Sequence, residues 1–215
     1  MAAPTVVGWS LPFAKEERVI LKVMSQKELR PVAESATMEL AVVRSGDGGL
    51  GKIIHSPDSR ELIEGVRMAR GTLWPDDRGC FQELFRSEQG LAEGFASGGN
   101  LQISAALSFS GTIKAIHYHI KQTDLWIPVT GMLQVMLYDL RTNSPTFGRL
   151  NTIYAGTLRP LQIRIPPGVG HGYKVLGAEQ ALLVYVTDQF YDSSDEGRLP
   201  WNDSDINYDW ETQRK

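Results

Sequence analysis

Three of the four histidines in this chain lie in two short segments whose residue types and spacing suit proton transfer or metal binding. His117 and His119 are separated by one residue, and Asp124 follows after four more. His171 closes a later segment, Pro166-Pro167-Gly168-Val169-Gly170-His171. Alternate residues of a strand point to the same face, so His117 and His119 are expected to look into one space. Imidazole titrates near neutral pH, which suits it to act as a general base.

The same residues also make a plausible donor set for a metal ion. His117, His119, Asp124 and His171 supply imidazole nitrogens and one carboxylate, and such nitrogen and oxygen ligands suit several divalent metals. The spacing alone therefore leaves acid–base chemistry and metal-assisted chemistry both open.

The elements that must position these residues read as strands. From Leu62 onward, short apolar or alternating runs are separated by turn signals, which indicates a sandwich or barrel rather than βαβ units. In this part of the chain, Ser87–Gly94 is expected to be a short helix or a loop. The predicted strands are Val66–Leu73, Cys80–Phe85, Leu101–Leu107, Ile113–His119, Leu125–Val129, Leu133–Leu140, Leu150–Tyr154, Leu161–Ile165, Gly172–Val175 and Ala181–Thr187.

The two ends of the chain are harder to assign. Residues 1–61 are expected to form an N-terminal extension, packed on the main domain or exchanged with a partner subunit. Within it, Lys15–Leu29 has helix-like apolar spacing, whereas Met38–Arg44 is typical of a strand. The tail from Phe190 to Lys215 is polar and irregular, but it contains Trp201, Tyr208 and Trp210. Such aromatic residues favour a tail that docks on the domain.

Composition narrows the function classes. At 215 residues, with 22% charged residues and a net charge of −3, the chain is long enough for one core and has no basic block that would indicate nucleic acid or an anionic membrane as partner. Cys80 is the only cysteine, so no intrachain disulfide is expected. The N-terminus has no secretory pattern, and no run approaches the roughly 20 apolar residues of a membrane span. We therefore expect a cytoplasmic protein.

Several motifs occur in one order along residues 62–210. They are Asp77-Arg78-Gly79 with Phe81 and Glu83, Gln102, Lys114 with His117-Tyr118, Asp139-Leu140-Arg141, Ser144-Pro145-Thr146-Phe147-Gly148, Pro166–Gly168 with His171, Tyr185, and Trp201-Asn202-Asp203. This series resembles the dTDP-4-dehydrorhamnose 3,5-epimerase family of the cupin superfamily. The resemblance implies an all-β cupin barrel (a double-stranded β-helix or jelly roll) over residues 62–215, with few short helices.

The resemblance also implies roles for individual residues. His117 would be the base, and Tyr185 the acid that returns a proton. Asp203 would be the carboxylate that orients His117, with Asp205 as the alternative. The residues expected to hold the nucleotide-diphosphate sugar are Arg78, Phe81, Glu83, Gln102, Lys114, His119, Arg141 and His171. The family implies a homodimer and no required cofactor.

Three positions depart from the family pattern. Lys114 stands where the family usually has arginine, His119 where it has glutamine, and Asp124 where it has a pocket lysine. An aspartate cannot stabilise an enolate as that lysine would, so Lys114, His171 or a metal ion would have to do so. The departures recreate the metal-ligand quartet of metal-binding cupins in His117, His119, Asp124 and His171.

The residues and the resemblance leave three candidate functions open. The leading one is an epimerase acting next to the C4 ketone of a nucleotide-linked 4-keto-6-deoxy-sugar, with inversion at one carbon or two left open. The second is a metal-dependent cupin enzyme, either an oxygenase or an isomerase. The third is a cupin that binds sugar nucleotides without turnover.

Overall fold

The computed structural model describes residues 38–44, 46 and 48–211, and these form a nearly all-β molecule, as the sequence predicts. The strands are β1 (Lys52–Ile53), β2 (Arg67–Arg70), β3 (Leu73–Asp76), β4 (Gly79–Gln82), β5 (Gln102–Ser108), β6 (Ile113–His119), β7 (Asp124–Thr130), β8 (Met132–Asp139), β9 (Leu150–Gly156), β10 (Leu161–Ile165), β11 (Val169–Leu176), β12 (Ala181–Thr187) and β13 (Glu196–Arg198). One 3₁₀ turn, η1 (Gly90–Ala92), lies in the segment predicted as a short helix or loop.

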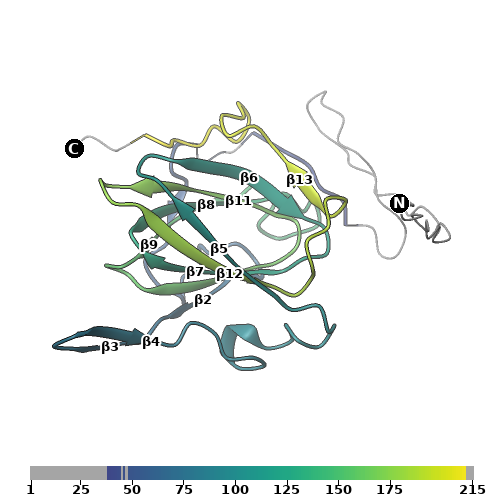
Figure 1. Ribbon diagram of the computed structural model, residues 1–215. Helices are drawn as coiled ribbons and strands as arrows, with labels where there is room; N and C mark the ends of the chain where they lie inside the picture. Colours follow the sequence, from purple (N-terminus) through teal and green to yellow (C-terminus); the bar gives the residue numbers. More distant parts are fainter. Residues whose placement is uncertain (1–37, 45, 47, 212–215) are drawn as a thin grey trace, which may run out of the picture.

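Two sheets face each other and form the barrel (Figure 1). One has the order β1-β9-β8-β11-β6-β13 and the other the order β2-β10-β7-β12-β5. Successive strands of the barrel often change sheet, which is the jelly-roll arrangement that the family resemblance implies. The predicted strands Ile113–His119, Leu161–Ile165 and Ala181–Thr187 have the observed bounds.

The space between the sheets is only partly filled by apolar side chains. Strands of both sheets contribute residues such as Leu133, Val135, Ile153 and Ile163, all fully buried. Removing a side chain of this size from water stabilises the fold by roughly 1.5–3 kcal/mol. Trp126 packs against this core and also lines the cavity described below, so it marks the boundary between the two.

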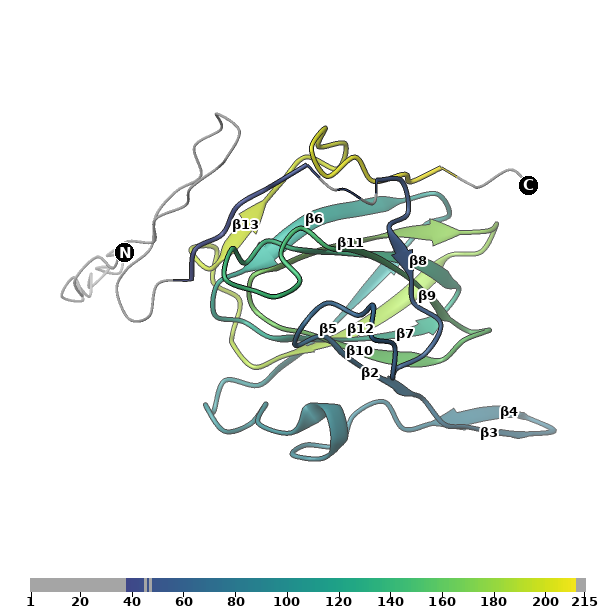
Figure 2. The same ribbon diagram turned by 180° about the vertical axis from the view of Figure 1, so that it is seen from behind.

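The C-terminal tail docks on the outer face of the six-stranded sheet, as its aromatic residues predict (Figure 2). Tyr208 and Trp210 are buried there, whereas Trp201 remains half exposed. Met38–Arg44 packs on the same face but does not form the predicted strand. Only Leu40 makes a β-bridge, to Arg141, because this segment lies over the sheet rather than along its edge.

Strands β3 and β4 form a separate hairpin that extends away from the barrel (Figure 1). On it, Trp74 and Phe81 make a tilted ring contact at 5.6 Å while remaining 51% and 65% exposed. The short strands β1 and β13 were not predicted, and the predicted strand Val66–Leu73 is divided between β2 and the first residue of β3. The helix-like pattern at Lys15–Leu29 lies outside the described residues. Among the residues that are described, no helix is long and apolar enough to cross a lipid bilayer.

Candidate active site

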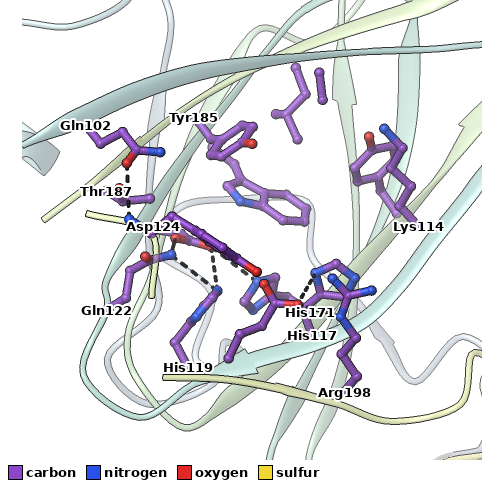
Figure 3. Close-up of a pocket in the computed structure, with 16 residues that line it drawn as sticks. Gln102, Lys114, His117, His119, Gln122, Asp124, His171, Tyr185, Thr187 and Arg198 are labelled. Carbon is purple, nitrogen blue, oxygen red and sulfur yellow. Dashed lines mark hydrogen bonds and ion pairs between the residues drawn. The ribbon is translucent and has the colours of Figure 1, made fainter. Parts of the chain in front are cut away.

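A cavity of about 350 Å³ lies between the two sheets (Figure 3). Strands of both sheets and the loop after β12 line it. The lining residues include Gln102, Lys114, His117, His119, Gln122, Asp124, Trp126, His171, Tyr173, Tyr185, Thr187, Tyr191, Glu196 and Arg198. Most of them are polar or aromatic, which suits a sugar and its polar substituents.

Strand β6 brings two histidines and a lysine to the cavity. His117 and His119 point inward, while the intervening Tyr118 is buried on the opposite face, as alternation predicts. Lys114 also faces the cavity although it lies an odd number of residues from His117. The register between β6 and β11 shifts between these two positions, and such a bulge re-aims a side chain. Gly172 accommodates it, because a Cβ there would clash with Ala115.

His117 sits next to a carboxylate. Its Nδ1 lies 4.0 Å from Glu196 Oε1, and Glu196 comes from the neighbouring strand β13. Burial, reinforced by the charge of His171, lowers the pKa of His117 to about 4, although Glu196 opposes the shift. The imidazole is therefore neutral at neutral pH, and it has a lone pair with which to accept a proton.

Tyr185 enters the cavity from the other sheet. It lies on β12, opposite Trp126 of β7 in the strand register, and it packs partly against the apolar core. His117 belongs to the six-stranded sheet, so the two side chains reach the same space from opposite walls. A ligand between the sheets would have a proton acceptor on one side and a phenol on the other.

His119, Asp124 and His171 form a buried cluster at one end of the cavity (Figure 3). Asp124 Oδ2 lies 3.2 Å from His171 Nε2 and 3.9 Å from His119 Nε2. Burial lowers the pKa of His119. Burial alone would raise the pKa of Asp124, but its close contact with His171 and the charges of both histidines outweigh it and lower that pKa. The sequence-based metal quartet thus comes together as three residues, with His117 outside the group.

Two residues expected at the site have other partners. Asp203 Oδ1 accepts hydrogen bonds from the backbone N–H groups of Asp205 and Ile206, and Asp203 does not line the cavity, so the carboxylate beside His117 is Glu196 instead. The Arg141 guanidinium donates hydrogen bonds to both carboxylate oxygens of Asp139. Asp139 is fully buried, so these bonds keep Arg141 at the structural pair and away from the cavity.

The predicted binding residues of the β3–β4 hairpin also lie outside this cavity. Arg78 pairs with Asp76, and its side chain is 84% exposed. Phe81 is exposed, and Glu83 pairs with Arg86 in the segment after β4. These side chains point into solvent in the single chain.

Other lining residues were not foreseen from the sequence. Gln122 bonds to Asp124, while Glu196 and Arg198 sit on β13. Asp195, which was also not foreseen, lies behind His119 and does not line the cavity. The β13 segment is too short and polar to show a strand pattern. The one sequence feature that marks this segment is the glycine at position 197, between Glu196 and Arg198. In the folded chain a Cβ at this position would overlap the Tyr118 ring.

The comparisons with known proteins agree with this architecture. A profile of the dTDP-4-dehydrorhamnose 3,5-epimerase family matches residues 60–215. The chain is 44% identical over 154 residues, 71% of its length, to a spore coat polysaccharide biosynthesis protein of Bacillus subtilis, covering 99% of that protein. It is 30% identical to the dTDP-4-dehydrorhamnose 3,5-epimerase of Shigella flexneri, with 70% of this chain and 84% of that enzyme covered.

A solved structure shares the fold and carries a sugar-nucleotide ligand. It is a 3'-monoepimerase of Streptomyces bikiniensis in complex with dTDP-quinovose, 27% identical with a TM-score of 0.58, and the match covers 67% of this chain and 74% of that one. With the family match over most of its length, this chain belongs to the dTDP-4-dehydrorhamnose 3,5-epimerase family and is a carbohydrate epimerase.

Proposed function

We propose that this enzyme inverts a carbon next to the C4 ketone of a nucleotide-linked 4-keto-6-deoxy-sugar. The observation that carries the proposal is the placement of His117 and Tyr185 on opposite walls of one cavity. Inversion requires a base on one face of the carbon and an acid on the other. A sugar ring between the two sheets would meet both.

The proton balance is simple. His117 takes the α-proton through the nitrogen that does not face Glu196, and the C4 ketone becomes an enolate. The Tyr185 hydroxyl then gives its proton to the opposite face of the same carbon. His117 ends protonated and Tyr185 ionised, and exchange with water restores both. Substrate and product have the same oxidation state, so the step uses no redox cofactor.

The enolate oxygen needs a positive or hydrogen-bonding neighbour. Lys114 and His171 line the cavity and are the candidates in this chain. The ammonium of Lys114 supplies a positive charge without the two-pronged geometry of an arginine.

The nucleotide diphosphate requires further binding groups. Arg198 lies at the cavity, and the exposed hairpin carries Arg78 and Phe81, with Glu83 directly after it. We propose that the enzyme is a homodimer in which this hairpin reaches the cavity of the partner subunit, where an aromatic ring and an arginine can bind base and phosphate. A dTDP ligand in the related monoepimerase supports the substrate class. The cytoplasmic location remains a prediction.

The test is solvent exchange. The enzyme is incubated in D₂O with dTDP-4-keto-6-deoxyglucose, and the sugar is followed by NMR. Deuterium at C3 only identifies a one-centre epimerase, and deuterium at C3 and C5 a two-centre enzyme. Lack of exchange with this sugar and with other nucleotide-linked 4-keto-deoxy-sugars would refute the proposal. Nucleotide binding without exchange, seen as a raised melting temperature, would favour a binding protein.

A further inference from the structure

We propose that His119, Asp124 and His171 bind one divalent transition-metal ion at the end of the sugar cavity. They come from β6, β7 and β11, they are all buried, and their potential ligand atoms lie within 4.8 Å of one another. The converging atoms are the Nε2 of each histidine and Asp124 Oδ2. The site is independent of the proposed epimerisation, because it is argued from the donor atoms alone.

The contact between His171 and Asp124 is the first evidence. His171 Nδ1 lies 2.9 Å from the carbonyl oxygen of Val169, which can only accept, so Nδ1 carries the proton. In the neutral ring, Nε2 therefore presents its lone pair to Asp124 Oδ2, 3.2 Å away. Two acceptors approach this closely only when a cation lies between them or bonds to both. That cation is either a second proton or a metal ion.

His119 is oriented in the same way, with one ring nitrogen facing the cluster and the other facing the surrounding protein. Its Nδ1 faces Asp195 Oδ2 at 4.0 Å, and three backbone N–H groups, those of Ile120, Lys121 and Gln122, fix the Asp195 carboxylate. Its Nε2 faces inward toward Asp124. Metal-binding histidines commonly have their outer nitrogen on a carboxylate or a backbone carbonyl, which orients the inner nitrogen. His171 meets this description through the carbonyl of Val169, whereas the outer nitrogen of His119 faces Asp195 at a distance longer than a hydrogen bond.

Gln122 occupies the remaining side of the cluster. Its amide nitrogen lies 2.7 Å from Asp124 Oδ1 and 3.2 Å from His119 Nε2, so one amide group serves two of the three candidate ligands. An amide donor is the group that satisfies such acceptors when no ion is bound. Turning the amide over would aim its oxygen, a further ligand, at the same point.

The distances and donor types indicate the class of ion. Zinc–nitrogen bonds of about 2.0–2.1 Å separate tetrahedral ligand atoms by roughly 3.3 Å. His171 and Asp124 already have this spacing at 3.2 Å, and His119 needs only a small approach from 3.9 Å. Two imidazoles and one carboxylate suit zinc, cobalt, manganese or iron(II), whereas magnesium and calcium prefer all-oxygen sites.

The experiment measures binding rather than turnover. The full chain is stripped with a chelator and titrated calorimetrically with Zn²⁺, Co²⁺ and Mn²⁺, with Mg²⁺ and Ca²⁺ as controls. We expect one Zn²⁺ or Co²⁺ per chain and a higher melting temperature. Asp124→Asn should weaken binding at least roughly 100-fold, because changing a residue behind a ligand already costs about 10- to 100-fold.

Controls separate the proposed ligands from other histidines. His55→Gln, at an exposed position, and His117→Gln should both keep one bound ion. Circular dichroism checks that each variant folds, and His119→Gln replaces Asp124→Asn if the latter does not. No stoichiometric binding by any of the three transition metals, or equal binding by the Asp124 and His119 variants, would overturn the site. In that case a proton bridges His171 and Asp124, and the epimerase proposal is unaffected because no sugar takes part in the test.

Discussion

Glu196 Oε1 lies 4.0 Å from His117 Nδ1, across the antiparallel pair of β13 and β6. The same oxygen accepts a hydrogen bond from Arg198 Nε, which fixes the carboxylate beside the imidazole. From this place its charge stabilises the imidazolium that forms after proton transfer. The separation is longer than a hydrogen bond. The contribution of Glu196 to the rate should therefore be smaller than the roughly 10²–10⁴-fold that the base itself contributes.

We therefore expect Glu196→Gln, which keeps the shape and removes the charge, to lower kcat for epimerisation by roughly 10- to 100-fold with little change in KM. Steady-state kinetics check this. The matched control is Asp203→Ala, which removes a cap of two backbone N–H groups and should cost about 1 kcal/mol of stability while leaving kcat intact. A large loss of kcat in Asp203→Ala, with unchanged kcat in Glu196→Gln, would show that Asp203 is the partner of His117.

A substitution of Asp139 tests whether Arg141 stabilises the fold rather than binds the substrate. The carboxylate is fully buried and accepts bonds from Arg141, Ser144 and Thr146. Asp139→Asn leaves the guanidinium without its partner and should lower the free energy of unfolding by roughly 3–5 kcal/mol, as measured by urea denaturation. A KM effect of Arg141→Met without loss of stability would instead place Arg141 in substrate binding.

The same pair predicts a pH dependence. Burial would raise the pKa of Asp139, but its bonds to Arg141, Ser144 and Thr146 lower it below the usual 3.8. The unfolded chain therefore takes up the proton first as the solution is acidified. The stabilisation by Asp139 is complete above about pH 4 and is lost as pH falls through the lower folded value. The stability gap between wild type and Asp139→Asn should shrink in that range, and a constant gap would contradict the assignment.

Hybrid dimers test whether the hairpin serves the partner subunit. A pocket variant, His117→Gln, is refolded together with a hairpin variant, Arg78→Ala with Phe81→Ala. In mixed dimers, the intact cavity of one chain would meet the intact hairpin of the other, so activity should rise above that of either variant alone. If each hairpin serves its own chain, the mixture shows no recovery. A monomeric protein by analytical ultracentrifugation would also exclude the arrangement.

The sequence predicts the barrel and part of the site, for identifiable reasons. Alternation on β6 places His117 and His119 on one face, and the observed strand has the predicted bounds. Strict alternation along β6 would place Lys114 on the face opposite to His117. The bulge that turns it inward depends on the pairing with β11, so it leaves no pattern in the sequence of β6. The inward position of Lys114 came from the family motif alone.

The carboxylate that lies beside His117 could not be found in this way. Glu196 lies on a three-residue polar strand whose pairing with β6 is visible only in the folded chain. Asp203 has the residue type and motif position expected of the partner, but its carboxylate is used within its own turn. Residues that act across a subunit boundary, as proposed for the hairpin, are equally hidden from the pattern of one chain.

The most direct test of the account is the stereochemical outcome of exchange in Tyr185→Phe. His117 remains, so deuterium from D₂O should still enter the α-carbon, but with retained configuration. Inversion should fall by roughly 10²–10⁴-fold, because the acid on the opposite wall is gone. NMR of the recovered sugar nucleotide reports both quantities. Inversion at the wild-type rate in this variant would contradict the central claim that His117 and Tyr185 act from opposite sheets.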